Sequence, residues 1–283
     1  MLYNERLLYI NENNESINIG YDFELIPVSG GFEDSVDNEL NTTKFALQNG
    51  STFVSSSLSD RAISVTFTYA IKNALAIEKE VMRVCNPAIE GTLYKINSFG
   101  EKFIKVRLLS APQIKRERGR GEITLDMQAC FPYYQTRNVS EMLAQLTPMT
   151  RFPLYWTTPE QRIFGTYIDV VNTDIENKGD VETGFTVTFK ARGDVLNPAF
   201  INNRTGEMIR LNMTMTQGDE VQIINMPFEK QVLVNGVKKF SVLDRVNTTF
   251  FNLVVGLNSF KIDADENATN LSVTVEYAPK YLT

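Results

Sequence analysis

The chain has 283 residues, of which 43% are hydrophobic and 22% charged, with a formal net charge of −6. This composition predicts a folded protein long enough for two domains, and the acidic balance argues against a clamp that binds nucleic acid by neutralising phosphates. The sequence contains no histidine, which excludes Ser-His-Asp and Cys-His nucleophilic sites and removes the commonest zinc ligand. Its two cysteines, Cys85 and Cys130, fit no metal spacing and are interpreted as buried apolar residues.

Charge is unevenly distributed along the first half of the chain. Residues 1–50 contain nine acidic and two basic side chains, whereas residues 51–150 contain thirteen basic and nine acidic ones. Two interpretations stay open: opposed patches that bring copies of the chain together, or solvated faces of either sign. Residues 1–6 lack a signal-peptide profile and no run of eighteen apolar residues occurs, so we expect no membrane insertion and use in the cytosol or in an assembled particle.

The N-terminal segment alternates apolar and polar residues. Strands are expected at 7–10 and 17–27, and the second places five large apolar residues on one face: Ile17, Ile19, Tyr21, Phe23 and Leu25. Residues 29–60 are rich in Gly, Ser, Asn and Asp and predict a loop. Loops this long are uncommon in compact domains unless they contact something, so we expect contact with a ligand or, preferably, a neighbouring subunit.

One helix interrupts the strands of this half. Residues 62–69 alternate strictly and predict a strand, and residues 73–84 follow with helical spacing. The expected apolar positions of the helix are Leu75, Val81, Met82 and Cys85, with Glu78 among the polar ones, and Asn86-Pro87 marks its end. Extended structure is expected again at 91–97, 102–109 and 122–134.

A basic cluster lies at residues 115–120, between two predicted strands. Gly119 and Gly121 bracket its end and no aromatic residue interleaves it, which indicates an exposed hairpin tip instead of a base-stacking surface. It is either a solvated turn or a contact for an acidic surface, such as the first fifty residues of an adjacent copy.

The apolar alternation stops after residue 134, and we place a domain boundary near residue 138, giving domains 1–137 and 138–283. Trp156, the single tryptophan, is interpreted either as a core anchor or as an exposed stacking platform. Strands are expected in this half at 163–171, 183–191, 199–202, 207–213, 220–225, 231–234, 247–253, 259–262 and 271–277.

Turn residues recur at regular intervals through the second half and predict short antiparallel strands that form a β-sandwich or a barrel. They occur in this order: Gly193-Asp194-Val195-x-Asn197-Pro198, Thr205-Gly206-Glu207, Leu211-Asn212, Gly218-Asp219, Asn235-Gly236, Leu243-Asp244, Phe250-Phe251 and Gly256-x-Asn258, closed by Val273-x-Val275-x-Tyr277-x-Pro279. This ordered set resembles the C-terminal domain of the distal tail (Dit) proteins of long-tailed siphophages and prophages.

The resemblance implies a mainly β fold. It places a tail-tube-like β-sandwich or split barrel with one helix at residues 1–137 and a galectin-like β-sandwich at residues 138–283. It further implies a structural baseplate hub protein and not an enzyme. Six copies would form a ring that joins the tail-tube and tape measure proteins to the tail-tip (Tal) protein, with receptor-binding proteins at the periphery. DNA would only pass through the lumen. The expected location is the virion tail tip, after assembly in the bacterial cytoplasm.

The alternative is a carbohydrate-binding module for cell-wall glycans. A galectin-type sugar site needs a His-Asn-Arg cluster with a tryptophan platform, and this chain has no histidine and no tryptophan after residue 156. Residues 263–267 begin like a calcium loop, but Ala268 replaces the turn glycine and Thr274 the bidentate glutamate, so a polar turn is expected. No catalytic, cofactor-binding or metal-binding residue is therefore assigned, and no cofactor is expected.

Overall fold

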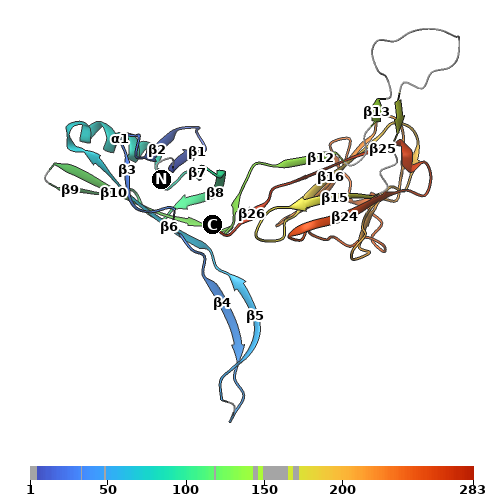
Figure 1. Ribbon diagram of the computed structural model, residues 1–283, viewed down its shortest axis with the longest axis horizontal. Coiled ribbons are helices and arrows are strands. Elements are labelled where there is room, and N and C mark those ends of the chain that lie inside the picture. Colours follow the sequence, from blue (N-terminus) through green and yellow to red (C-terminus); the bar gives the residue numbers. More distant parts are fainter. Residues whose placement is uncertain are drawn as a thin grey trace, which may run out of the picture. The chain divides into compact units, whose positions relative to one another are not determined.

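The structure is a computed structural model that describes residues 5–32, 34–47, 49–117, 119–142, 146–148, 165–167 and 172–283. It forms two compact units (Figure 1). Unit 1 contains residues 1–136 and 281–283, and unit 2 contains residues 137–280. The chain is mainly β, as predicted. Among the described residues, no helix is long and apolar enough to cross a membrane.

Unit 1 is built on a ten-stranded sheet whose described pairs are antiparallel. Its main path is β2-β1-β7-β8-β10-β6-β3, while β9 pairs with β10 and β11 with β8 and β26. The sheet is open and not closed into a barrel. Its strands are β1 (Arg6–Asn11), β2 (Ser16–Gly20), β3 (Ile26–Gly30), β6 (Arg61–Ala70), β7 (Gly91–Asn97), β8 (Gly100–Leu108), β9 (Gln113–Glu117), β10 (Arg120–Ala129), β11 (Tyr134–Gln135) and β26 (Lys280–Tyr281).

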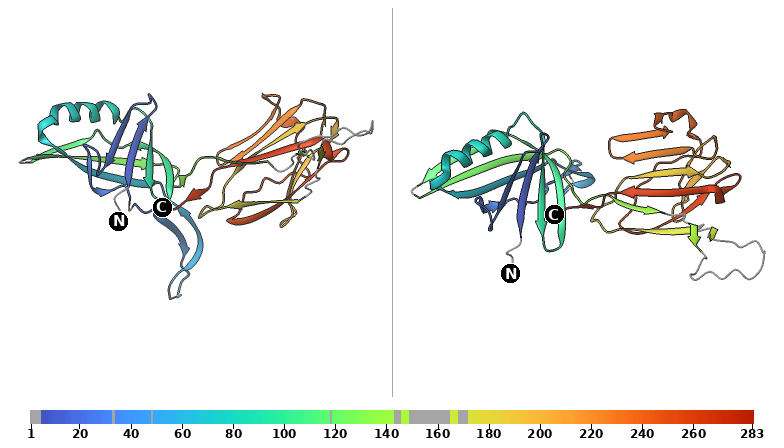
Figure 2. Two further views of the ribbon diagram at one scale, coloured as in Figure 1. Left: turned by 45° about the horizontal axis from the view of Figure 1, so that its top comes forward. Right: turned by 90° about the horizontal axis from the view of Figure 1, so that it is seen from above.

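The one α-helix among the described residues, α1 (Ala74–Val84), covers one face of this sheet after a 3-10 turn, η1 (Ile71–Asn73) (Figure 2). The helix was predicted correctly, and so was the burial of Val81 and Cys85, but two other predicted apolar positions are exposed. Ile77, Val81 and Val84 face the core, whereas Leu75 is 76% exposed and Met82 42% exposed. Residues at positions i, i+4 and i+7 share a helix face, so Ile77, Val81 and Val84 form one apolar stripe that packs on the core. Leu75 and Met82 lie on another part of the helix surface and face solvent.

The strand predicted at 17–27 is wrong in its second half. The chain turns after Gly20, where the Phe23 amide donates to the Gly20 carbonyl (3.1 Å) and the Gly20 amide to the Leu25 carbonyl (2.9 Å). The turn separates β2 from β3 and removes Tyr21 and Phe23 from the buried face, leaving them 56% and 36% exposed. The period-two alternation of apolar residues continues through residues 21–24 of the sequence, although these residues form a turn and not a strand.

The loop predicted at 29–60 is also wrong in part, because it contains a two-stranded hairpin. Its strands are β4 (Asn38–Thr43) and β5 (Thr52–Leu58), which we call the arm. Figure 1 shows the arm extending from the ends of β3 and β6, beyond the sheet of unit 1. The Ser, Thr and Asn residues that suggested a loop form a hydrogen-bonded ladder here, and Asn41 Nδ2 donates to Ser55 Oγ across it (3.1 Å).

Unit 2 contains a six-stranded sheet, β12-β25-β16-β21-β22-β23, and a four-stranded sheet, β15-β24-β18-β19. The strands of the first are β12 (Val139–Met142), β16 (Phe185–Ala191), β21 (Glu220–Met226), β22 (Glu229–Val234), β23 (Val237–Lys238) and β25 (Leu271–Tyr277). Those of the second are β15 (Asn172–Asn177), β18 (Ala199–Asn202), β19 (Met208–Arg210) and β24 (Gly256–Asp263). Two small pairs, β13 (Leu146–Pro148) with β14 (Gly165–Tyr167) and β17 (Val195–Leu196) with β20 (Thr214–Met215), and two 3-10 turns, η2 (Phe240–Val242) and η3 (Ala268–Asn270), complete the unit.

Aromatic rings from both sheets fill the core of unit 2. Phe185 of β16 lies 5.7 Å from Phe200 of β18, and Phe200 lies 4.7 Å from Phe260 of β24, between ring centroids. Phe251 contacts all three rings at 5.3 to 6.1 Å. Because the rings come from facing sheets, unit 2 is a β-sandwich, one of the two architectures that the turn pattern predicted.

The structure of unit 2 differs from the sequence prediction at one strand and agrees with it at one turn. The predicted strand at 247–253 is wrong: among the described residues, only Leu253 of this segment makes a bridge, with Thr183. The Asp244 carboxylate accepts from the Val246 and Asn247 amides, which favours a turn. The Asn235-Gly236 hairpin between β22 and β23 was predicted correctly, and both residues have the positive φ it requires, 49° and 80°. Trp156 and most of 163–171 lie outside the described residues.

Candidate functional site

The side chains with chemical potential that the sequence suggested have structural roles. Among the described residues, no group of three or more His, Cys, Asp or Glu side chains is placed to hold a metal ion. In the calcium-like segment, Arg210 Nη2 donates to both carboxylate oxygens of Asp265 (2.8 and 2.6 Å), and Asn197 Nδ2 donates to Oδ2 (2.7 Å). The segment joins β24 to β25 and is a polar turn, as expected.

The two cysteines differ from each other. Cys85 is buried beside the core of unit 1, where desolvation raises the pKa of its thiol to about 12. Cys130 was predicted to be buried as well, but it is exposed, because β10 ends at Ala129 and the chain turns away from the sheet there. A thiol as weakly acidic as that of Cys85 has little nucleophilic thiolate at neutral pH.

The basic cluster forms the tip of the β9–β10 hairpin, as predicted. Arg116 turns back toward the helix: its Nε and Nη2 donate to the Glu78 carboxylate at 2.9 and 2.5 Å, and the Tyr69 hydroxyl donates to the same group. Hydrogen bonds from Arg116 and then Tyr69 lower the pKa of Glu78 to about 2. Arg116 therefore anchors the hairpin within unit 1, while Lys115 and Arg120 lie beside Glu117 at 3.3 and 3.8 Å.

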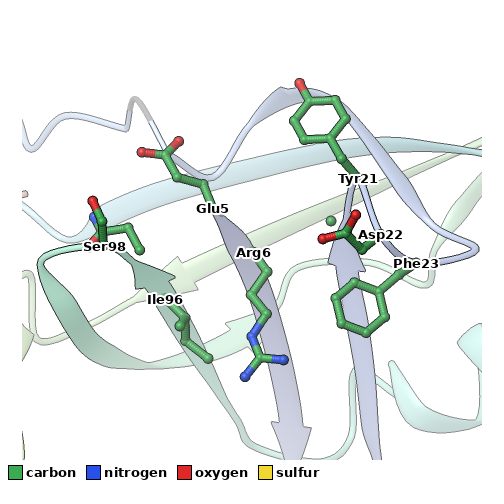
Figure 3. Close-up of a pocket in the computed structure, with 9 residues that line it drawn as sticks. Glu5, Arg6, Tyr21, Asp22, Phe23, Ile96 and Ser98 are labelled. Carbon is green, nitrogen blue, oxygen red and sulfur yellow. The ribbon is translucent and has the colours of Figure 1, made fainter. Parts of the chain in front are cut away.

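A shallow cavity of about 330 Å³ lies where β1, the β2–β3 turn and β7 end. Figure 3 shows Arg6 between Ile96 and Phe23, with Glu5, Tyr21 and Asp22 around the rim. The Arg6 guanidinium carbon is 6.0 Å from the centre of the Phe23 ring. Since the lining has two acidic residues and one basic residue, the cavity presents no concentrated charge of one sign.

The arm has the features of a surface that binds another protein. Within the described residues its two strands pair only with each other, and large apolar side chains on it are exposed: Leu40 (62%), Phe45 (65%), Leu47 (106%), Phe53 (60%) and Val54 (61%). Leu40 and Thr42 share one face of β4, and Phe53 lies opposite Thr42, so Leu40 and Phe53 lie on the same face. An isolated two-stranded hairpin is marginally stable in water, and clustered exposed apolar residues mark interaction sites.

The base of the arm is held by buried charges. Asp34, just before the arm, accepts from Arg61 Nη1 (2.9 Å), from the Tyr134 hydroxyl (2.9 Å) and from Lys95 Nζ. We call these four residues the root cluster; each side chain is at most 8% exposed. Burial alone would raise the pKa of Asp34, but the hydrogen bonds and the charge of Lys95, with the bonds from Arg61 and Tyr134, lower it overall. The sequence pattern did not indicate this cluster, because its members are far apart along the chain.

Comparison with known proteins agrees with this architecture. Residues 178–281 match the family model described as siphovirus-type tail component, C-terminal domain. Residues 178–281 are therefore similar to the C-terminal domain of the siphophage distal tail components of the Dit type. It is 27% identical over 113 residues to YomH, an SPbeta prophage-derived uncharacterized protein of Bacillus subtilis (strain 168). That match covers 40% of this chain and spans only 41% of the length of YomH.

The likeness to a solved structure extends over both units. The SPP1 Dit protein (gp 19.1), described as a paradigm of hub adsorption apparatus in phages that infect Gram-positive bacteria, superposes with a TM-score of 0.70. The match covers 98% of this chain and 99% of SPP1 Dit at 10% sequence identity, and it therefore shows a shared fold. The predicted resemblance to the distal tail family is confirmed for residues 178–281, and the shared fold extends over both units.

Proposed function

We propose that six copies of this protein form a ring at the distal end of a phage tail and act there as the baseplate hub. Residues 1–137 would be the tail-tube-like, ring-forming domain and residues 138–283 a galectin-like domain that projects outward. The ring would join the tail-tube and tape measure proteins to the tail-tip protein and would hold receptor-binding proteins at its periphery. DNA would pass through the lumen without being bound, and the protein would catalyse no reaction.

The arm is the observation that carries this proposal. It extends beyond the sheet of unit 1, exposes apolar residues, and contains only two charged residues between 38 and 58, Glu39 and Lys44. A nearly uncharged apolar surface fits a permanent contact between protein subunits, since charged residues are depleted at the centre of such interfaces. In a closed ring every copy gives an arm to one neighbour and receives one from the other, so no arm is left exposed.

The proposal is tested by the assembly of arm variants. The full-length protein, concentrated or mixed with purified tail tubes, is examined by negative-stain microscopy and light scattering. We expect six-fold rings from the native chain and their loss from the Leu40→Ser/Phe53→Ser double variant. Its matched control is Val246→Ser/Leu257→Ser, two residues of unit 2 that are 91% and 67% exposed, which should leave rings intact.

Location is tested separately on intact virions. Antibody raised against this chain should label the junction between tail tube and tail tip in electron micrographs. Labelling along the whole tail, or none at that junction, would contradict the proposed position. Rings that form equally well from the arm double variant would show that the arm is not the contact between copies.

A further inference from the structure

One guanidinium group holds three separated stretches of unit 1 together. Arg61 is 0% exposed. Its Nη1 donates to the side chain and the backbone carbonyl of Asp34 (2.9 and 3.3 Å), its Nε to the Pro132 carbonyl (2.8 Å), and its Nη2 to the Leu282 carbonyl (2.6 Å). All three nitrogens of this planar group are therefore engaged, each with a different part of the chain or a different acceptor.

The contacted stretches have specific places in the topology. Arg61 is the first residue of β6 and follows β5, whereas Asp34 precedes β4, so this pair joins the two ends of the arm. Between them, the Ser59 amide donates to the Asp37 carbonyl (2.9 Å). Pro132 and Leu282 belong to the two connections between the units, since the chain passes into unit 2 after residue 136 and returns after residue 280.

Because of the charges in the root cluster, Arg61 needs the Pro132 and Leu282 carbonyls as hydrogen-bond acceptors in addition to Asp34. Arg61 and Lys95 share the single carboxylate of Asp34, and their charged groups lie 5.0 and 4.2 Å from the centre of the Tyr134 ring. The cluster thus has two cations and one anion. The carbonyl dipoles of Pro132 and Leu282 compensate the excess positive charge, and a buried donor that loses such an acceptor bears its full desolvation cost.

We infer that Arg61 couples the arm to both connections of unit 2. When the C-terminal residues 281–283 leave their place, Arg61 loses an acceptor, its hold on Asp34 weakens, and the base of the arm loosens. A displacement of either connection then changes the order of the arm. The consequence, that contacts between copies respond to events at unit 2, rests on the proposed function; the coupling itself is a property of the single chain.

The test is hydrogen exchange with mass spectrometry on the monomeric full-length chain. Removal of residues 282 and 283, which leaves both residues of β26 in place, should speed exchange across the arm, residues 38–58, by roughly tenfold or more, because Arg61 loses one charged hydrogen bond. Arg61→Met should do the same. Lys95→Met removes one donor to Asp34 but keeps the Asp34–Arg61 pair and both carbonyl bonds, so it should speed arm exchange less than Arg61→Met does. Arg107→Met, at a residue whose side chain is 61% exposed, is the matched surface control.

A double variant separates coupling from independent damage. If Arg61 carries the coupling, Arg61→Met combined with the truncation should be no worse for the arm than Arg61→Met alone. Unchanged arm exchange in the truncated chain, or additive effects in the double variant, would overturn the inference. Should Arg61→Met fail to fold, the truncation decides the matter alone. Since the readout needs no ring, loss of rings with normal coupling would refute only the proposed function.

Discussion

Replacing Glu78 by alanine should destabilise unit 1 mainly because the buried Tyr69 hydroxyl loses its hydrogen-bond acceptor. The Tyr69 hydroxyl, on a residue only 2% exposed, donates to Glu78 and would lose its acceptor, which costs about 1–3 kcal/mol. Arg116 is 54% exposed at its side chain and can return to water, so its lost ion pair adds about 0–1 kcal/mol. The expected total is about 1–4 kcal/mol.

The measurement is urea unfolding read by hydrogen exchange in peptides from α1 and β6, which reports unit 1 without interference from unit 2. Glu80→Ala, at an exposed glutamate of the same helix, is the matched control and should cost less than about 0.5 kcal/mol. Adding Tyr69→Phe to Glu78→Ala removes the orphaned hydroxyl and should recover about 1 kcal/mol or more. Equal losses from Glu78→Ala and Glu80→Ala, or no recovery in the double variant, would refute this reasoning.

Three further predictions follow from residues already described. Because the pKa of Glu78 falls from its ordinary 4.5 to about 2 on folding, its stabilisation is fully present above pH 4.5 and should be lost between about pH 4.5 and 2; native and Glu78→Gln proteins should therefore converge in stability at low pH, and a constant difference would contradict this. Phe200→Ala should cost unit 2 about 3–5 kcal/mol in calorimetry, against less than about 1 kcal/mol for the 40% exposed Phe240→Ala. Gly30→Ala should prevent normal β3–β6 pairing, since a Cβ would lie 1.8 Å from the Ser64 carbonyl oxygen, whereas Gly50→Ala, also at positive φ but in open space, should cost only about 1–2 kcal/mol of backbone strain.

Sequence reasoning succeeded where local pattern decides structure. The strands β18 and β25 were placed correctly, and β6 within a residue at each end, because strict alternation or a bounded apolar run leaves few other choices. It failed where a distant partner decides. Glu78 is buried because Arg116, thirty-eight positions away, satisfies its charge. The root cluster could not be predicted from the sequence for the same reason, because Asp34 and Arg61 come into contact only when the arm is folded between them.

The arm was missed for a different reason. Its Ser, Thr and Asn content is typical of loops, and its apolar residues Leu40, Phe45 and Phe53 are spaced without a clear period. The register shifts by one residue opposite Asn41 and Thr42, where Val54 of β5 is left without a paired residue, so Phe53 and Ser55 do not alternate regularly across the bulge. The contact with a neighbour expected for this segment was inferred from its length alone and stays a prediction.

The strands β11 and β26 pair with each other beside the positions where the chain leaves unit 1 and comes back to it. Unit 2 is thus inserted in the chain between β11 and β26, two adjacent strands of unit 1. We call unit 1 the host, because its residues come from both sides of the insertion. A short turn from residue 136 to residue 281 would close the host, and a different module could take the vacated place. Such an arrangement would allow the inserted unit to be exchanged by recombination while the fold of the host is kept.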